Sequence, residues 1–519
     1  MYFITMSMEK TDSLFLLVKS LTKSEKRQFK LYAGRLGGNS EKNFIALFSV
    51  LDKLEEFDEK QILLKTNIKK QQLSNSKAHL YRQILVSLKL NPMHQNAKMQ
   101  VREQLDFATI LYNKGLHKQS LKVLDKAKGI ALTNEDSIQA FSIVELEKVV
   151  ESQYITRSLR SRADDLILQS RDLGEKTLML SKLSNLSLQL YSMLLKKGYV
   201  SNDKDFDEVR SFFKESLPEY SIKKLGVIER LYLYKAYLWY SFIIQDFVSG
   251  YRYAQKWVDL FYYNPEMKKS NPVFYLKGIN YLLESLFLVQ HLTKFRSTLN
   301  FFEEELNNQK FLLNENTESL AFLYLYLNKI NLYFLEGNFK KGLRFIPEVL
   351  EEIESYRLKI DEHHVMVFYY KFASMYFGAA NYEKSIFYLE KIIKNKQLGM
   401  REDLLCFTRI LNLIAHYEAG MDQNLEALIK STYKFLIKMN ELHLVQQRII
   451  SFLRNLSNIY PHELKNAFKE LHRELKVFEN HPYEKRSFMY LDIISWLESK
   501  IDNVSVESII RKKSRIQYK

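Results

Sequence analysis

The histidines are the residues of this 519-residue chain with the widest capacity for chemistry. Neutral imidazole is a common metal ligand, so the pair His363 and His364 and the later His462, His472 and His481 were the first candidates for a metal site. Adjacent histidines on a helix point about 100° apart, however, and no cysteine or carboxylate stands at ligand spacing beside them. The sequence therefore predicts no metal site.

The sequence also lacks the signatures of the common enzyme classes. It contains no glycine-rich phosphate loop, no G-x-S-x-G nucleophile elbow, no Cys-x-x-Cys pair and no H-E-x-x-H helix. The single cysteine, Cys406, lies in an apolar stretch with helical periodicity, where a buried thiol is the simplest interpretation. We therefore expect a protein that is not an enzyme, needs no cofactor and uses Cys406 in no reaction.

Basic residues gather near the N-terminus. The first hundred residues hold 17 Lys and Arg against 9 Asp and Glu, and residues 60–102 hold nine basic residues and no acidic one. This excess suits contact with phosphates, and a helix–turn–helix between Glu59 and Leu90 would have its turn at Gln71 to Ser76. Lysine outnumbers arginine, which favours phosphate contact over base readout. The candidate nucleic-acid-binding residues are Lys69, Lys70, Lys77, Arg82 and Lys89.

Residues 1–95 therefore form a basic helical module or a cap. Thr22 and Glu25 have the spacing of a capping box, and Asp58 or Ser74 could begin later helices. At the other end of the chain, the cluster Arg511 to Arg515 is interpreted as a frayed, solubilising terminus.

A turn that recurs between amphipathic segments organises the rest of the chain. Small residues follow several of these turns, and from Gly250 onward the aligned positions are 48, 44, 43 and 40 residues apart. Further units are expected at Asp136 to Leu173 and Glu175 to Ser216, and a last hairpin turns at Tyr460 to His462. The recurring turns are Lys114-Gly115-Leu116-His117, Glu336-Gly337-Asn338-Phe339, Ala379-Ala380-Asn381-Tyr382 and Ala419-Gly420-Met421-Asp422, and the aligned residues are Ser120, Gly250, Thr298, Gly342, Ser385 and Leu425.

The hairpins resemble the tetratricopeptide repeat family. In residues 368–392 the family's small residues fall on Ala373 and Ser385, its aromatic on Tyr376 and its turn on Asn381 and Tyr382. The resemblance implies an all-α solenoid of about nine hairpins, with repeats near 43 residues instead of the family's 34, and HEAT-like packing stays open. The expected divisions are the N-terminal module 1–95, a solenoid 96–480, and C-terminal capping helices with a basic tail 481–519. The opening Leu21 to Lys30 is also similar to the start of some bacterial helical-repeat proteins, which implies no function.

The resemblance further implies a partner. Members of the family bind extended peptides along the first helices of their hairpins, and some grip a carboxylate with Lys and Asn. Only Lys235 and Asn331 match that grip, so a chaperone-tail clamp is disfavoured. The frame places four polar residues on the expected binding face: Lys235, Asn331, Lys371 and Ser374.

Two functions are consistent with these patterns. The first is a non-catalytic protein-interaction scaffold or adaptor in the cytoplasm, with a protein or peptide as its partner. The alternative is a nucleic-acid-binding regulator that uses the basic N-terminal module. No membrane span is expected, because the most apolar long window, Leu320 to Leu335, is interrupted by polar residues and a span needs about 20 apolar residues.

Overall fold

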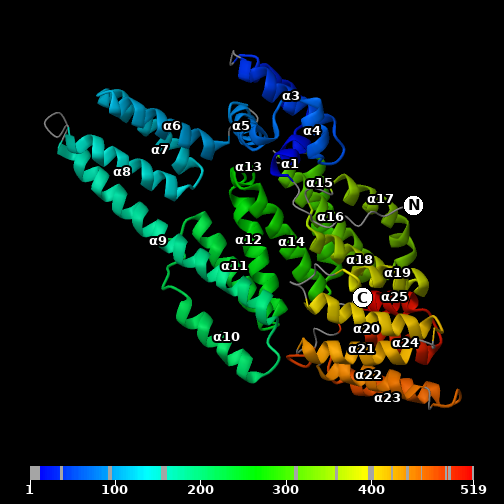
Figure 1. The fold of residues 1–519 in the computed structure, drawn as a ribbon. Helices are drawn as coiled ribbons and strands as arrows, with labels where there is room; N and C mark the ends of the chain where they lie inside the picture. The colour runs from blue at the N-terminus through cyan, green and yellow to red at the C-terminus, as the bar shows by residue number, and fades with distance from the viewer. Residues whose placement is uncertain are drawn as a thin grey trace. The chain divides into compact units, whose positions relative to one another are not determined.

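The computed structural model confirms the all-α expectation over the residues that it describes (Figure 1). Those residues contain no β-strand, and none of their helices is both long and apolar enough to cross a membrane. The described residues are 12–35, 39–91, 96–153, 160–308, 314–356, 360–395, 402–421, 425–439, 443–456, 459–484, 488 and 492–516.

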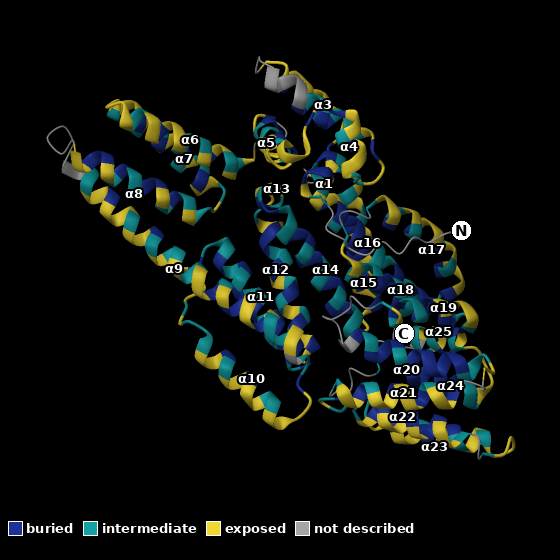
Figure 2. Ribbon diagram, in the orientation of Figure 1, coloured by how far each residue is buried: buried dark blue, intermediate teal, exposed yellow. Residues whose placement is uncertain are grey.

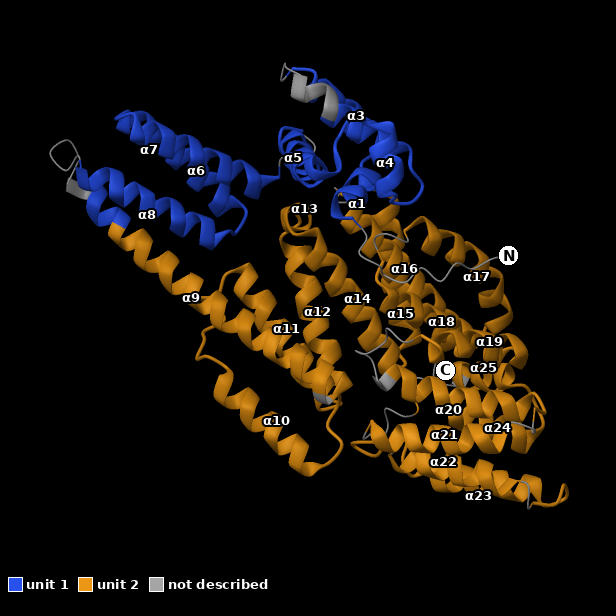
Figure 3. Ribbon diagram, viewed as in Figure 1, with its two compact units in different colours: residues 1–166 blue, residues 167–519 orange. Residues whose placement is uncertain are grey.

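The chain forms two compact units, residues 1–166 and 167–519 (Figure 3). The boundary falls inside helix α9, Arg160–Lys197. The expected divisions near residues 95 and 480 stay predictions. The helices before α9 are α1 Ser13–Ser20, α2 Lys23–Ala33, α3 Asn39–Lys53, α4 Glu59–Lys65, α5 Lys70–Lys89, α6 Ala97–Asn113, α7 His117–Thr133 and α8 Ser137–Gln153.

The second unit contains the remaining helices of the chain. Its helices after α9 are α10 Asp203–Ser216, α11 Val227–Ile243, α12 Phe247–Tyr263, α13 Glu266–Ser270, α14 Pro272–Leu288, α15 Leu292–Asn307, α16 Glu315–Glu336, α17 Phe339–Ser355, α18 Glu362–Gly378, α19 Tyr382–Ile393, α20 Glu402–Glu418, α21 Leu425–Lys438, α22 Leu444–Asn455, α23 Leu464–Lys476, α24 Ile493–Asp502 and α25 Val506–Ile516.

Helix starts in the first unit follow the expected capping chemistry at two positions. The Thr22 hydroxyl accepts a hydrogen bond from the Glu25 amide at 3.2 Å, and the Glu25 carboxylate accepts one from the Thr22 amide at 2.7 Å. At the start of α4, the Asp58 carboxylate accepts from the amides of Lys60 and Gln61. These side chains satisfy amides that a helix start leaves without partners.

The expected turn at Gln71 to Ser76 is wrong, because α5 is continuous through it. Leu73, Leu80 and Ile84 are buried along one stripe of α5, so helical burial continues across the polar segment. That segment has no glycine or proline to end the helix, and Ser74 caps nothing. The chain turns earlier, between the end of α4 and the start of α5.

The expected break near Gly174 is also wrong. The single helix α9 runs through it, with Leu173, Leu183, Leu186 and Leu190 buried. An isolated glycine in a helix costs only about 1 kcal/mol, which the buried leucines offset. Two of the expected hairpins are therefore replaced by α8, the long α9 and α10.

Successive helices pair as hairpins in the second unit. The pairs α11/α12, α14/α15, α16/α17, α18/α19, α20/α21 and α22/α23 are each in contact, and the first helices α14, α16, α18 and α20 contact one another in order. Figure 2 shows long buried stretches in α16 and α18, whereas α10 has an exposed face. This stacking is that of a helical repeat, and a tetratricopeptide-like solenoid of about nine hairpins stays a prediction.

The turn glycines adopt a left-handed backbone conformation. Gly115, Gly337 and Gly420 have φ values of 75°, 62° and 67°, in the left-handed region that favours glycine. Ala380 adopts a similar φ of 60° in the turn without a glycine. Asp422, the last residue expected in these turns, lies outside the described residues.

Small residues allow the helices to approach closely, as predicted. A Cβ atom on Gly342 would lie 2.6 Å from the Met375 Sδ atom of the next first helix. Ser120 and Ser385 are fully buried, and the Ser120 hydroxyl donates to the Ala108 carbonyl at 2.8 Å. The aligned small positions are thus contact points between helices.

The end of the chain returns to earlier turns, so the interpretation of Arg511 to Arg515 as a frayed tail is wrong. These residues belong to α25, where Arg511 Nε donates to the Gly337 carbonyl at 3.0 Å. Nearer α23, the Tyr483 hydroxyl donates to Asp203 at 2.6 Å. The hairpins therefore do not contact only their neighbours in sequence. Residues 517–519 lie outside the described part of the chain.

Candidate partner-binding site on the first helices

The four polar residues expected on the binding face lie on α11, α16 and α18. The structure brings two of them together: Lys371 Nζ donates to Asn331 Oδ1 at 2.7 Å. The Ser374 hydroxyl instead donates to the Tyr370 carbonyl of its own helix at 3.0 Å, so it is not free for a partner as expected. Lys235, on α11, lies over the ring of Tyr232 at 5.6 Å from its centroid.

Lys371 begins a directional chain of hydrogen bonds across three successive first helices. Asn331 Nδ2 donates to Asn328 Oδ1 at 3.3 Å, and Asn328 Nδ2 donates to Asn280 Oδ1 at 3.0 Å. Asn328 Nδ2 also donates to the Tyr324 carbonyl at 2.8 Å. Buried amides require such partners, and here they form a polar seam through α14, α16 and α18. We call Asn280, Asn328, Asn331 and Lys371 the polar seam.

The sequence contains a signal for Asn328 but none for Asn280, the other seam member that was not predicted. Asn328 interrupts the apolar window of α16. Glu284, Asn328 and Lys371 follow one another at intervals of 44 and 43 residues, which is the spacing of the repeat. Polar residues at one repeat position are unusual in otherwise apolar helices, and they could have indicated a shared face.

Lys371 occupies an apolar environment. Its ammonium lies over the rings of Phe287 and Phe334, at 5.0 and 5.5 Å from their centroids. Burial lowers the pKa of Lys371 from 10.5 to about 8, and the negative charge of Glu284 opposes this shift. Burial and the nearby charge of Lys277 also lower the pKa of Lys235. Both ammonium groups would gain from a negative partner.

Aromatic side chains surround the acidic residue of this face. Trp239 lies 5.0 Å, centroid to centroid, from both Tyr191 and Tyr281. Burial raises the pKa of Tyr281, and the charges of Tyr324 and Glu284 add to the shift. Trp239 Nε1 is buried and has no hydrogen-bond partner among the described residues. The first helices therefore carry cations, amides, a carboxylate and a buried indole donor.

The candidate nucleic-acid-binding residues do not form one exposed set. Lys77 is ion-paired with Asp12 and lies over the Phe57 ring at 4.9 Å, so it holds the first unit together. Its role as a phosphate contact stays a prediction, and a phosphate there would compete with Asp12 for the ammonium. The remaining candidates are exposed on α5 or immediately before it: Lys69, Lys70, Arg82 and Lys89.

Cys406 is buried, as predicted, at 2 % exposure. Within the described ranges, no three His, Cys, Asp or Glu side chains gather in a way that could hold a metal ion.

No protein-family model matches this chain, and no match to it is found among curated proteins. The tetratricopeptide resemblance therefore rests on the residues and on the stacking of the first helices.

Proposed function

We propose that this protein is a non-catalytic interaction scaffold of the cytoplasm, with a tetratricopeptide-like repeat region that binds an extended segment of a partner protein along its first helices. The observation that carries the proposal is the polar seam. It crosses three successive first helices, where Asn280 and Lys371 are partly exposed to a segment lying across them, while Asn328 and Asn331 are buried beneath.

The seam suits a peptide because an extended backbone has alternating donors and acceptors. Asparagine offers both, and an ammonium with three donors can add a bond to a carboxylate or a carbonyl. Lys371 uses one donor on Asn331 and remains partly exposed. Lys235 and Lys277 add positive charge on neighbouring first helices. We therefore propose a partner segment that carries acidic side chains.

The test is selection of unstructured peptides from a displayed random library on the full-length protein. Selected peptides are then measured against Asn331→Ala and Lys371→Met variants. Each substitution should weaken binding by about tenfold, because a polar contact to a charged group is lost. Lys340→Met, at an exposed position on the second helix α17, is the matched control and should leave affinity unchanged.

Two results would contradict the proposal. One is a set of selected peptides that bind both seam variants as well as the native protein. The other is a failed selection together with nucleic-acid binding that falls steeply with salt and is lost when Lys69, Lys70, Arg82 and Lys89 become Gln. The second result would favour the nucleic-acid-binding regulator.

A further inference from the structure

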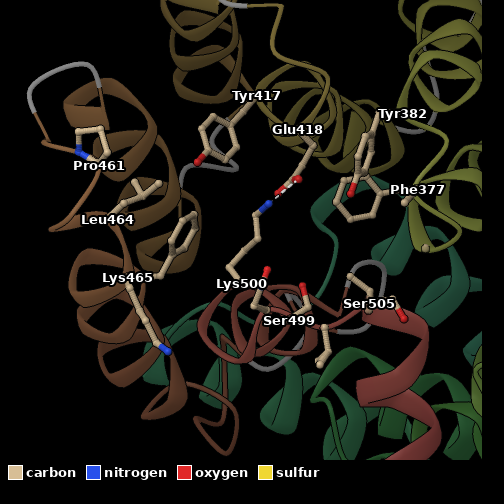
Figure 4. Close-up of a pocket in the computed structure, with 16 residues that line it drawn as sticks. Phe377, Tyr382, Tyr417, Glu418, Pro461, Leu464, Lys465, Ser499, Lys500 and Ser505 are labelled. Carbon is tan, nitrogen blue, oxygen red and sulfur yellow. Dashed lines mark hydrogen bonds and ion pairs between the residues drawn. The ribbon is translucent and has the colours of Figure 1, made fainter.

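A pocket of about 350 Å³ lies where the returning C-terminal helices meet the hairpin turns of the second unit (Figure 4). The turn between α18 and α19 forms one side, α23 another, and the connection from α24 to α25 closes the base. The volume is at the small end of the range for sites that bind small molecules. This pocket is separate from the polar seam, and the sequence indicated Ala380, Tyr382 and Pro461 only as turn residues.

The one carboxylate that lines the pocket is already satisfied. Glu418 accepts hydrogen bonds from Trp496 Nε1 and Lys500 Nζ, each at 2.7 Å. Tyr382 is also hydrogen-bonded to Glu418. Burial, the charge of Glu418 and this hydrogen bond together raise the pKa of the Tyr382 phenol. The Glu418 side chain is only 4 % exposed. It therefore fastens α24 to the hairpins, and its charge is already compensated by Lys500.

The two lysines that line the pocket retain unused donors. Lys500 reaches toward Glu418 in Figure 4, and that bond occupies one of the three donors of its ammonium. Lys465, on α23, is exposed and makes no hydrogen bond or ion pair with any described residue. With Glu418 neutralised by Lys500, the lining side chains retain one net positive charge.

The remaining walls combine aromatic and aliphatic side chains with the polar Ser499, Asn503 and Ser505. Phe377, Tyr417, Leu464 and Phe468 line the pocket, and Phe468 is 3 % exposed. Such walls favour an apolar body, while the lysines favour an anionic group at its end. A neutral ligand would leave Lys465 without a charged acceptor.

We propose that this pocket binds a carboxylate attached to a compact apolar body. Two sources share that chemistry: a free organic acid, and the C-terminal residue of a peptide. In either case, the carboxylate would pair with Lys465 and Lys500, and the apolar body would contact the aromatic walls. The site is new and does not depend on the proposed function of the first helices.

Calorimetric titration of the full-length protein distinguishes the sources. The probes are 3-phenylpropanoate, a tetrapeptide ending in phenylalanine with a free carboxylate, and the uncharged amides of both. Each acid should bind more tightly than its own amide. The free acid alone would identify a small-molecule site, and tighter binding of the peptide would identify a C-terminus. Absence of binding by both acids would overturn the proposal.

Charge reversal on α23 locates the binding. Lys465→Glu should weaken the affinity for whichever acid binds by about tenfold or more, because the substituted carboxylate repels the carboxylate of the ligand. Lys469→Glu carries the same change one helical turn later, at an exposed position that does not line the pocket, and should bind as the native protein does. Both positions are exposed, so thermal unfolding should be unaffected. Equal affinity of the two variants would place the acid elsewhere.

Discussion

At the scale of single residues, Lys371 combines two properties that rarely occur together. Its ammonium is desolvated enough to lower its pKa to about 8, yet its hydrogen bond is to an amide and not to a carboxylate. The nearby charge of Glu284 offsets only part of this desolvation, and ionisable groups with strongly shifted pKa values are more common at binding sites than elsewhere. The folded protein thus bears the free-energy cost of desolvating the Lys371 ammonium, and a bound acidic group would reduce that cost.

The first prediction concerns the pH dependence of stability. The unfolded chain holds the Lys371 proton up to its ordinary pKa of 10.5, whereas the folded protein releases it near pH 8. Between these values the unfolded state binds more protons, so the unfolding free energy rises with pH by up to about 1.4 kcal/mol per unit. Lys371→Met should remove this rise in urea unfolding between pH 8 and 10. The same slope in both proteins would show that Lys371 titrates normally.

The second prediction compares two turn glycines. A Cβ atom on Gly337 would lie 2.9 Å from the Arg511 amide nitrogen of α25, whereas one on Gly420 would meet no atom within 4 Å. Both residues have positive φ, so Gly420→Ala should cost about 1 kcal/mol through backbone strain alone. Gly337→Ala should cost at least ~1 kcal/mol more, because α25 must also move. Equal losses in urea unfolding would mean that α25 does not pack on this turn in solution.

At the scale of elements, α5 shows how burial determines a helix where local composition suggests a turn. The polar run at its start is exposed, while Leu73 and Leu80 remain in register on the buried side. Glutamine, serine and asparagine are compatible with an exposed helix surface, and only tertiary packing shows that the helix continues.

Proline substitutions test the start of α5. Lys70 is its first residue, and Lys69 before it has φ −70° and ψ 146°, which a following proline favours. Lys70→Pro should therefore be nearly neutral. Ser74→Pro, inside the helix, should cost about 3 kcal/mol by removing a hydrogen bond and clashing with the preceding turn. Chemical denaturation would measure both, and a tolerated Ser74→Pro would restore the expected turn at Gln71 to Ser76.

At the scale of the chain, the second unit is fastened by contacts between distant segments. Arg511 joins three groups, donating to the carbonyl of Gly337 and to the side chains of Asn338 and Glu507. The Gln245 amide donates to the Tyr483 carbonyl at 3.3 Å, and the Glu484 carboxylate accepts from the first amides of α22. The last part of the chain thus ties turns together that a simple repeat array would leave apart.

Removal of the Arg511 contacts should weaken the attachment of α25 to the turn between α16 and α17. Arg511→Met should lower the unfolding free energy by about 1 to 2 kcal/mol, since charge-assisted hydrogen bonds are lost at a partly exposed site. Hydrogen exchange should also quicken at the turn between α16 and α17. Arg515→Met, at an exposed position on the same helix, is the control and should change neither quantity. An unchanged exchange rate in Arg511→Met would show that α25 adds nothing to the turn.

The sequence by itself determined the local features of this protein. Periodicity predicted the helices, and the turn at Gly337 and the capping box at Thr22 followed from backbone and side-chain chemistry that acts within a few residues. The repeat frame also placed Asn331 and Lys371 on one face, because the hairpin pattern recurs along the chain. These signals are local, so one sequence contains them.

Only the tertiary structure decided which helical segments are continuous and which residues far apart in the sequence contact one another. The continuity of α9 past Gly174 depends on leucines buried against other helices, and the return of α25 to Gly337 depends on packing between residues 174 positions apart. The polar seam reaches Asn280 only because two helices stack, and the pocket beside Glu418 exists only because α24 lies against the hairpin turns. Contacts of this kind depend on how helices pack, which no short pattern in the sequence specifies.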